Sequence, residues 1–213
     1  MEEARGKLVV IRFDGAKCVH SRQCVLSRPD VFVPNVKGEW IHPDAASPDE
    51  IAALAQSCPS GAITYERLDG GPAERAPLVN LLTIRENGPL AFRASLRVER
   101  EDGTAQTALR ATLCRCGHSK NKPYCDGAHG TAGFHATGEP IAKEAAGLAT
   151  RDGELTVQPT KNGPLHVIGN LEVVSGTGRT VHKTTDAWLC RCGHSKNKPY
   201  CDGSHNKAGW KSE

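Results

Sequence analysis

A seventeen-residue segment occurs twice in this 213-residue chain and constrains its fold more than any other feature. The first copy, at 113–129, reads LCRCGHSKNKPYCDGAH, and the second, at 189–205, reads LCRCGHSKNKPYCDGSH. The two copies differ only at Ala128 against Ser204. Each contains three cysteines and one histidine in the spacing C-x-C-x8-C-x3-H. The near-identity of the two copies, set in more divergent flanks, predicts two working sites within one chain.

The spacing inside each copy favours a cluster of two irons. Two cysteines one residue apart can hold one metal in a short loop, and Cys125 and His129 are four apart, which on a helical turn brings both side chains to one side. A [2Fe–2S] cluster suits two such ligand pairs, one on each iron. A mononuclear zinc site remains the alternative, although paired zinc ligands usually have two to four residues between them. The candidate ligands are Cys114, Cys116, Cys125 and His129 in the first copy and Cys190, Cys192, Cys201 and His205 in the second.

The repeat extends beyond the two motifs. NGPL occurs at 87–90 and again at 162–165, and in each case apolar residues then alternate with polar ones. Period-two alternation predicts half-buried strands. Turn residues at 101–103 and 175–176 would close a hairpin ahead of each motif. We therefore expect two β-rich domains, at 78–137 and 138–213.

The N-terminal part of the chain predicts a separate small domain. Ser47, Pro48 and Glu50 form the start signal of a helix, which should end before Cys58 because Pro59 stops it. The Gly- and Pro-rich stretch 68–77 is typical of a linker. The expected domain is 1–67, with strands at 7–13, 38–41 and 62–67 and a helix at 48–57.

Three more cysteines lie in this domain and predict a third metal site. Bacterial ferredoxins bind a [4Fe–4S] cluster through C-x2-C-x2-C and a distant Cys-Pro. Here Cys18 and Cys24 take the outer positions, Ser21 takes the middle one, and Cys58 precedes proline. Three thiolates at this spacing predict a [3Fe–4S] cluster. The alternatives are a [4Fe–4S] cluster completed by His20, Ser21 or water, and a site without a cluster.

The repeated motif resembles that of the CDGSH iron–sulfur (mitoNEET-like) family, C-x-C-x2-[ST]-x3-P-x-C-D-G-[SA]-H. The resemblance covers about 78–213, and it implies a redox-active, acid-labile [2Fe–2S] cluster on three cysteines and one histidine. Members with one motif are anchored homodimers, whereas this chain has two motifs, and we expect no anchor. The resemblance therefore implies halves that pair around a pseudo-two-fold axis within one chain. A second resemblance, over about 7–66, is to single-cluster ferredoxins that lack one cysteine. The motif positions matched besides the ligands are Ser119, Pro123, Asp126, Gly127 and Ala128, then Ser195, Pro199, Asp202, Gly203 and Ser204.

The expected fold class is α+β, with a small ferredoxin-like N-terminal domain followed by two β-rich CDGSH domains. Nine cysteines in three groups of three indicate metal binding in a reducing cytoplasm rather than a disulfide scaffold. No apolar run approaches the roughly 18 residues of a membrane span. A membrane is therefore not expected as a partner. Nucleic acid is not expected either, because no basic run carries interleaved aromatics.

These patterns predict an electron-transfer protein with two [2Fe–2S] clusters and one [3Fe–4S] cluster. Iron–sulfur cluster transfer, or redox or pH sensing, is the alternative, and a zinc-stabilised interaction module is the third hypothesis. The expected partners are redox proteins or apo-proteins that accept clusters, and the expected state is a monomer with an internal pseudo-dimer. No catalytic residues are expected, because ligation accounts for the cysteines and the motif histidines.

Overall fold

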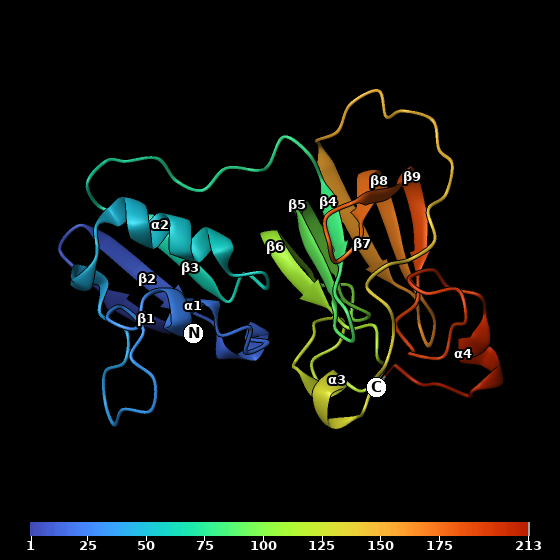
Figure 1. Ribbon diagram of the computed structural model, residues 1–213, viewed down its shortest axis with the longest axis horizontal. Helices are drawn as coiled ribbons and strands as arrows, with labels where there is room; N and C mark the ends of the chain where they lie inside the picture. Colours follow the sequence, from blue (N-terminus) through green and yellow to red (C-terminus); the bar gives the residue numbers. More distant parts are fainter. Residues whose placement is uncertain (213) are drawn as a thin grey trace. The chain divides into compact units, whose positions relative to one another are not determined.

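The computed structural model describes residues 1–212 and divides into two compact units, Met1–Arg75 and Ala76–Glu213. The second unit consists mostly of strands with two short helices, whereas the first unit combines three short strands with two α-helices and two 3-10 helices (Figure 1). Among the helices that can be described, none has the length and apolar character needed to cross a membrane.

The N-terminal unit is a three-stranded antiparallel sheet covered by one longer helix (Figure 1). The helix, α2, begins as the sequence predicts: the Ser47 hydroxyl accepts from the Glu50 amide, and the Glu50 carboxylate accepts from the Ser47 amide at 2.9 Å. Its buried face packs on the sheet in one apolar core. The elements are β1 (Glu2–Arg5), β2 (Val9–Phe13), η1 (Gly15–Lys17), α1 (Gln23–Ser27), η2 (Pro43–Ala45), α2 (Pro48–Ser57) and β3 (Ile63–Arg67).

One strand prediction in this unit is wrong. Residues 38–41 do not form a strand, and only Ile41 makes an isolated bridge, to Phe32. Gly38 has a φ of 104°, a left-handed conformation that interrupts an extended run. Two short elements, β1 and α1, were not predicted, because four or five residues carry too little periodicity to identify.

The second unit is built on one six-stranded sheet that contains strands of both repeats. The hairpins predicted ahead of each motif are present: β5 pairs antiparallel with β6, and β8 pairs antiparallel with β9. Each hairpin leads into a cysteine motif that ends in a four-residue helix. The elements are β4 (Leu81–Ile84), β5 (Leu90–Glu99), β6 (Ala105–Leu113), α3 (Ala128–Thr131), β7 (Glu154–Pro159), β8 (Leu165–Val174), β9 (Thr180–Leu189) and α4 (Ser204–Lys207).

The first strand of each repeat is shared with the other repeat. Strand β4 pairs antiparallel with β5 of its own repeat and parallel with β8 of the other. Strand β7 pairs antiparallel with β8 of its own repeat and parallel with β5 of the first repeat. Leu82 and Phe92 of the first repeat share one buried core with Leu155 and Val167 of the second. The two repeats therefore form one folding unit, since neither could bury its apolar face alone.

Candidate metal centres

The first cysteine pair follows β6 directly, where the end of the strand places both thiols in the interior. Cys114 and Cys116 are almost fully buried, and their Sγ atoms lie 3.6 Å apart. The amide of Cys114 donates to the carbonyl of Pro123 at 2.9 Å, which folds the loop back over the strand end. Gly117 then turns the chain with a φ of 86°, and the amide of His118 donates to Cys116 Sγ at 3.5 Å.

The remaining two predicted ligands of the first site lie on either side of a second turn. The amide of Cys125 donates to the carbonyl of Thr112 at 2.9 Å, so this cysteine returns to the end of β6. Gly127 occupies the N-cap position of α3, and Asp126 Oδ1 accepts from the first amide of that helix at 3.0 Å. His129 is on the helix, with its Nδ1 atom 3.4 Å from Cys125 Sγ. The structure thus brings this cysteine and histidine together, as their spacing predicts.

The second site repeats this geometry closely. Cys190 Sγ and Cys192 Sγ are 3.7 Å apart, against 3.6 Å in the first site. Cys201 Sγ lies 3.5 Å from His205 Nδ1, against 3.4 Å. The amide of Gly203 donates to Cys201 Sγ at 3.4 Å, as the amide before α3 does in the first repeat. Two equivalent donor sets therefore come from the two copies of the motif.

In each Cys–Cys pair one thiol donates a hydrogen bond to the other. A hydrogen bond from the Cys116 thiol lowers the pKa of Cys114 to about 6, and the same bond raises the pKa of Cys116. The Cys190–Cys192 pair behaves alike, with the pKa of Cys190 lowered to about 6. Burial raises the pKa of Cys125 to about 11. A metal binds the thiolate form, so loading either site releases protons.

In the sequence, one arginine separates the two cysteines of each pair, and in the structure it is buried. No role was predicted for it. Arg115 is 1% exposed, and its guanidinium donates to four backbone carbonyls, among them those of Gly88 at 2.8 Å and Thr137 at 3.2 Å. Burial lowers its pKa to about 10, which still leaves it charged at neutral pH. The signal was available in the sequence, because the tripeptide C-R-C occurs in both copies.

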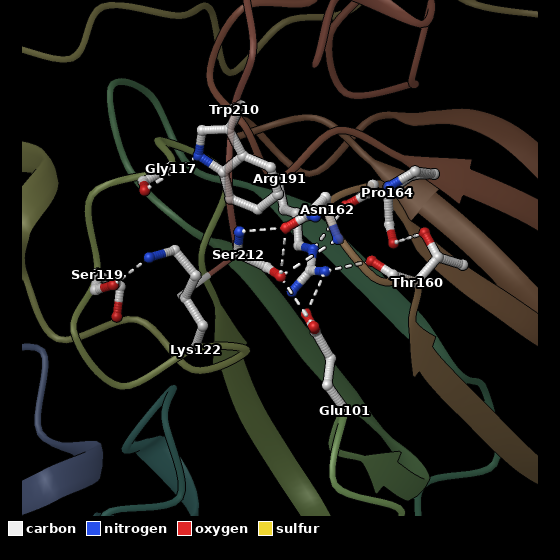
Figure 2. Close-up of polar contacts among 11 residues, drawn as sticks. Glu101, Gly117, Ser119, Lys122, Thr160, Asn162, Pro164, Arg191, Trp210 and Ser212 are labelled. Carbon is white, nitrogen blue, oxygen red and sulfur yellow. Dashed lines mark hydrogen bonds and ion pairs between the residues drawn. The ribbon is translucent and has the colours of Figure 1, made fainter. Parts of the chain in front are cut away.

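The second arginine has a carboxylate partner from the other repeat (Figure 2). Arg191, also 1% exposed, donates from Nε to the carbonyl of Gly163 at 2.6 Å and from Nη2 to Glu101 Oε1 at 2.6 Å. Glu101 belongs to the β5–β6 turn, and its other oxygen accepts from the Ser212 hydroxyl at 2.8 Å. The Trp210 ring lies 5.1 Å from the Arg191 guanidinium. Residues 90 or more positions apart therefore meet beside the second motif.

The loops of the two sites touch each other through their backbones. Cys116 and Cys192 form an isolated antiparallel bridge. A Cβ atom on Gly117 would lie 2.5 Å from the carbonyl oxygen of Cys192, and one on Gly193 would lie 2.5 Å from that of Cys116. Trp210 Nε1 donates to the Gly117 carbonyl at 3.3 Å from the same side (Figure 2). Glycine is required at both positions because no side chain fits between the loops.

The three N-terminal cysteines line one cavity of about 380 Å³. Cys18 follows η1, Cys24 lies in α1, and Cys58 is the residue after α2. Burial raises the pKa of both Cys18 and Cys24. His20 and Ser21, the residues predicted as possible completing ligands, line the same cavity. Most of the remaining wall is apolar, including Val25, Val33, Trp40, Leu54 and Ile63.

The donors present fit iron–sulfur clusters. All nine cysteines are free thiols. Across residues 1–212, no three His, Cys, Asp or Glu side chains lie close enough to hold a single metal ion. In each repeat the donors form one Cys–Cys pair and one Cys–His pair, and backbone amides face the sulfurs. Thiolate and imidazole in two pairs suit a two-iron cluster, and three thiolates around an apolar cavity suit a cubane-type cluster.

Three segments of the chain match known protein families. Residues 87–130 and 162–206 each match the family described as iron-binding zinc finger, CDGSH type. Residues 4–68 match the family described as divergent 4Fe-4S mono-cluster. A comparison with curated proteins gives no match. The family matches confirm both resemblances that the cysteine motifs predicted.

Proposed function

We propose that this chain, with two segments that match the CDGSH family and one that matches the divergent 4Fe-4S mono-cluster family, is an electron-transfer protein with three iron–sulfur clusters. Each repeat would hold a [2Fe–2S] cluster, and the N-terminal unit would hold a cubane-type cluster. Such clusters each take up and release one electron. The expected partners are redox proteins, and no enzymatic role is proposed.

The observation that carries this proposal is the doubled donor set. Each repeat supplies a buried pair of thiols and a Cys–His pair, with matching distances in the two copies. The amides of His118 and Gly127 face the sulfurs of the first site, and such N–H groups stabilise negative charge on sulfur. The buried cation Arg115 interacts electrostatically with Cys116 and with Cys190 and adds to the same effect.

The pairing of the two repeats supports a pseudo-two-fold arrangement in a single chain. Strands β4 and β7 each pair with the other repeat, and the two repeats bury one shared core. We propose that this internal pair replaces the homodimer of one-motif relatives, so the chain acts as a monomer. The nine free thiols support a reducing, cytoplasmic setting.

Metal analysis tests the proposal. Protein purified without oxygen should contain iron and acid-labile sulfide. Single Cys116→Ser and Cys192→Ser variants should each lose about two irons, because each removes a ligand of one [2Fe–2S] cluster. A Ser27→Ala variant, which changes no ligand, is the control. Zinc in place of iron in the repeats would overturn the proposal.

Cluster transfer is the second candidate function, and the position of the histidines favours it. His129 and His205 are only partly buried and lie on four-residue helices, whereas the Cys–Cys pairs are buried. An imidazole leaves iron more readily than a thiolate does. Mixing reduced protein with an oxidised ferredoxin, and loaded protein with an apo-ferredoxin, separates the two functions: the first measures electrons delivered and the second measures clusters delivered.

A further inference from the structure

We propose that Trp210 is a positioning residue for the second metal centre: it holds helix α4, and with it His205, against the motif loop of the first repeat. The inference rests on the proposed function, because it assumes a [2Fe–2S] cluster bound in part by Cys201 and His205. It goes beyond that function in naming a residue outside the motif that sets how firmly this cluster is held.

The backbone of Trp210 is joined directly to the ligand histidine. Its amide donates to the carbonyl of His205, five residues back, at 3.0 Å. Gly209 lies between them with a φ of 60°, a left-handed conformation that ends the helix. A helix of four residues is not stable by itself, so contacts outside it must hold it in place. The place of the histidine therefore depends on what holds Trp210.

The side chain of Trp210 contacts the first repeat (Figure 2). Its Nε1 atom donates to the carbonyl of Gly117 at 3.3 Å, and Gly117 directly follows Cys116, a predicted ligand of the first site. Lys122 Nζ lies 5.9 Å from the centre of the ring, and it also donates to the carbonyl of Ser119 at 2.6 Å. The indole thus links the segment after α4 to the loop that carries the first cysteine pair.

Two further contacts hold the same C-terminal segment (Figure 2). The Arg191 guanidinium lies 5.1 Å from the Trp210 ring, within the range of a cation–π contact. Ser212 is 8% exposed, and its hydroxyl donates to Glu101 of the first repeat at 2.8 Å. Its amide donates to Asn162 Oδ1 at 3.0 Å. The backbone on both sides of the indole is therefore fixed, and the ring is held against the first motif.

The first repeat has the same arrangement without the indole N–H. Phe134 takes the place of the tryptophan, and its amide donates to the carbonyl of His129 at 3.1 Å. Its ring lies 5.5 Å from the Arg115 guanidinium and 5.9 Å from Lys198 Nζ. Phenylalanine has no ring N–H, so it cannot donate to the other loop as the indole does. This difference between the repeats defines the substitution that tests the role of the N–H group.

Trp210→Phe, made in two backgrounds, tests the proposal. Cys116→Ser should leave the second [2Fe–2S] cluster and Cys192→Ser the first, with the N-terminal cluster common to both. The measurement is the rate of iron release to a chelator at about pH 8, where histidine is neutral. Histidine leaves iron only when α4 opens, and losing one hydrogen bond should make opening about fivefold more frequent. Release should therefore be about fivefold faster with Cys116→Ser and unchanged with Cys192→Ser.

Two more variants complete the test. Trp210→Ala also removes the ring contact and should speed release more than about tenfold, again with Cys116→Ser alone. In otherwise wild-type protein, Trp210→Phe should speed the release of about two irons per chain. An unchanged rate in the Cys116→Ser protein would overturn the assignment, and so would equal acceleration in both backgrounds, which would mean a general loss of stability. Wild-type protein without iron would instead refute the proposed function.

Discussion

Replacing Glu101 by glutamine should destabilise the second unit, because it leaves a buried arginine without its counter-charge (Figure 2). Arg191 is 1% exposed and Glu101 is 31% exposed, at a distance of 2.6 Å. Removing one partner of a fully buried pair costs about 3–5 kcal/mol. The carboxylate is partly solvated, and glutamine keeps an oxygen that can accept from Arg191, so we expect about 2 kcal/mol. With a urea m-value of about 2 kcal/mol/M, the midpoint should fall by about 1 M.

A matched control is available on the neighbouring strand. Glu99 is 30% exposed, almost the same as Glu101, but its partner Arg97 is 45% exposed and lies 3.4 Å away. Exposed pairs contribute about 0–1 kcal/mol, so Glu99→Gln should shift the midpoint far less. The assay is urea unfolding followed by tryptophan fluorescence, since Trp210 lies over the Arg191 guanidinium.

Equal midpoints for the two glutamine variants would refute this reasoning. Such a result would mean that backbone carbonyls alone suffice for a buried guanidinium. Arg115 makes that outcome physically conceivable, because its hydrogen bonds within the described residues all go to carbonyls. The comparison therefore measures what a carboxylate adds to a site that carbonyls already satisfy.

Three further predictions concern the ligands, the contact between the loops and the oligomeric state. A histidine ligand must be neutral, and burial lowers the pKa of His129, so protonation there sets in below the ordinary value of about 6.5. The visible absorbance of the clusters should therefore persist at about pH 8 and fade below about pH 6. The double variant His129→Cys with His205→Cys should fade more slowly, and an equal rate at about pH 5 would rule out histidine as the labile ligand. In urea unfolding, Gly117→Ala should destabilise the unit far more than Gly103→Ala. Both glycines have positive φ, but only at Gly117 would a Cβ meet the Cys192 carbonyl. Similar losses of stability in the two variants would show that backbone strain alone causes the destabilisation. Light scattering should give the mass of one chain, and a stable homodimer would contradict the internal pairing of the repeats.

Local signals in the sequence predicted local structure well. The Ser47–Glu50 capping box placed the start of α2 at the right residue, because both hydrogen bonds are made within one turn. The alternation after each NGPL predicted β5 and β8, and the turn residues predicted their hairpins. The Cys–His spacing of four predicted that Cys125 and His129 would meet, although the helix begins only at Ala128.

Non-local pairings could not be predicted in the same way. The parallel pairing of β4 with β8 and of β7 with β5 depends on how two similar apolar faces fit together, which no single segment encodes. Glu101 is a turn residue in a stretch that reads as solvent-exposed, and its contact with Arg191 spans 90 positions. Residues 38–41 do not form a strand, because Gly38 at the start of the segment adopts a left-handed conformation.

The contact between the two motif loops explains why the copies are nearly identical while their surroundings differ. Gly117 packs on the Cys192 carbonyl and Gly193 packs on the Cys116 carbonyl, so the two loops contact each other through their backbones. A change in one loop would alter both sites, and the same shape is required on both sides. The contacts of the two arginines differ: Arg115 donates to backbone carbonyls, and Arg191 donates to the Glu101 carboxylate as well as to carbonyls. The two donor sets have matching geometry, but only the arginine of the second motif donates a hydrogen bond to a carboxylate among the described residues.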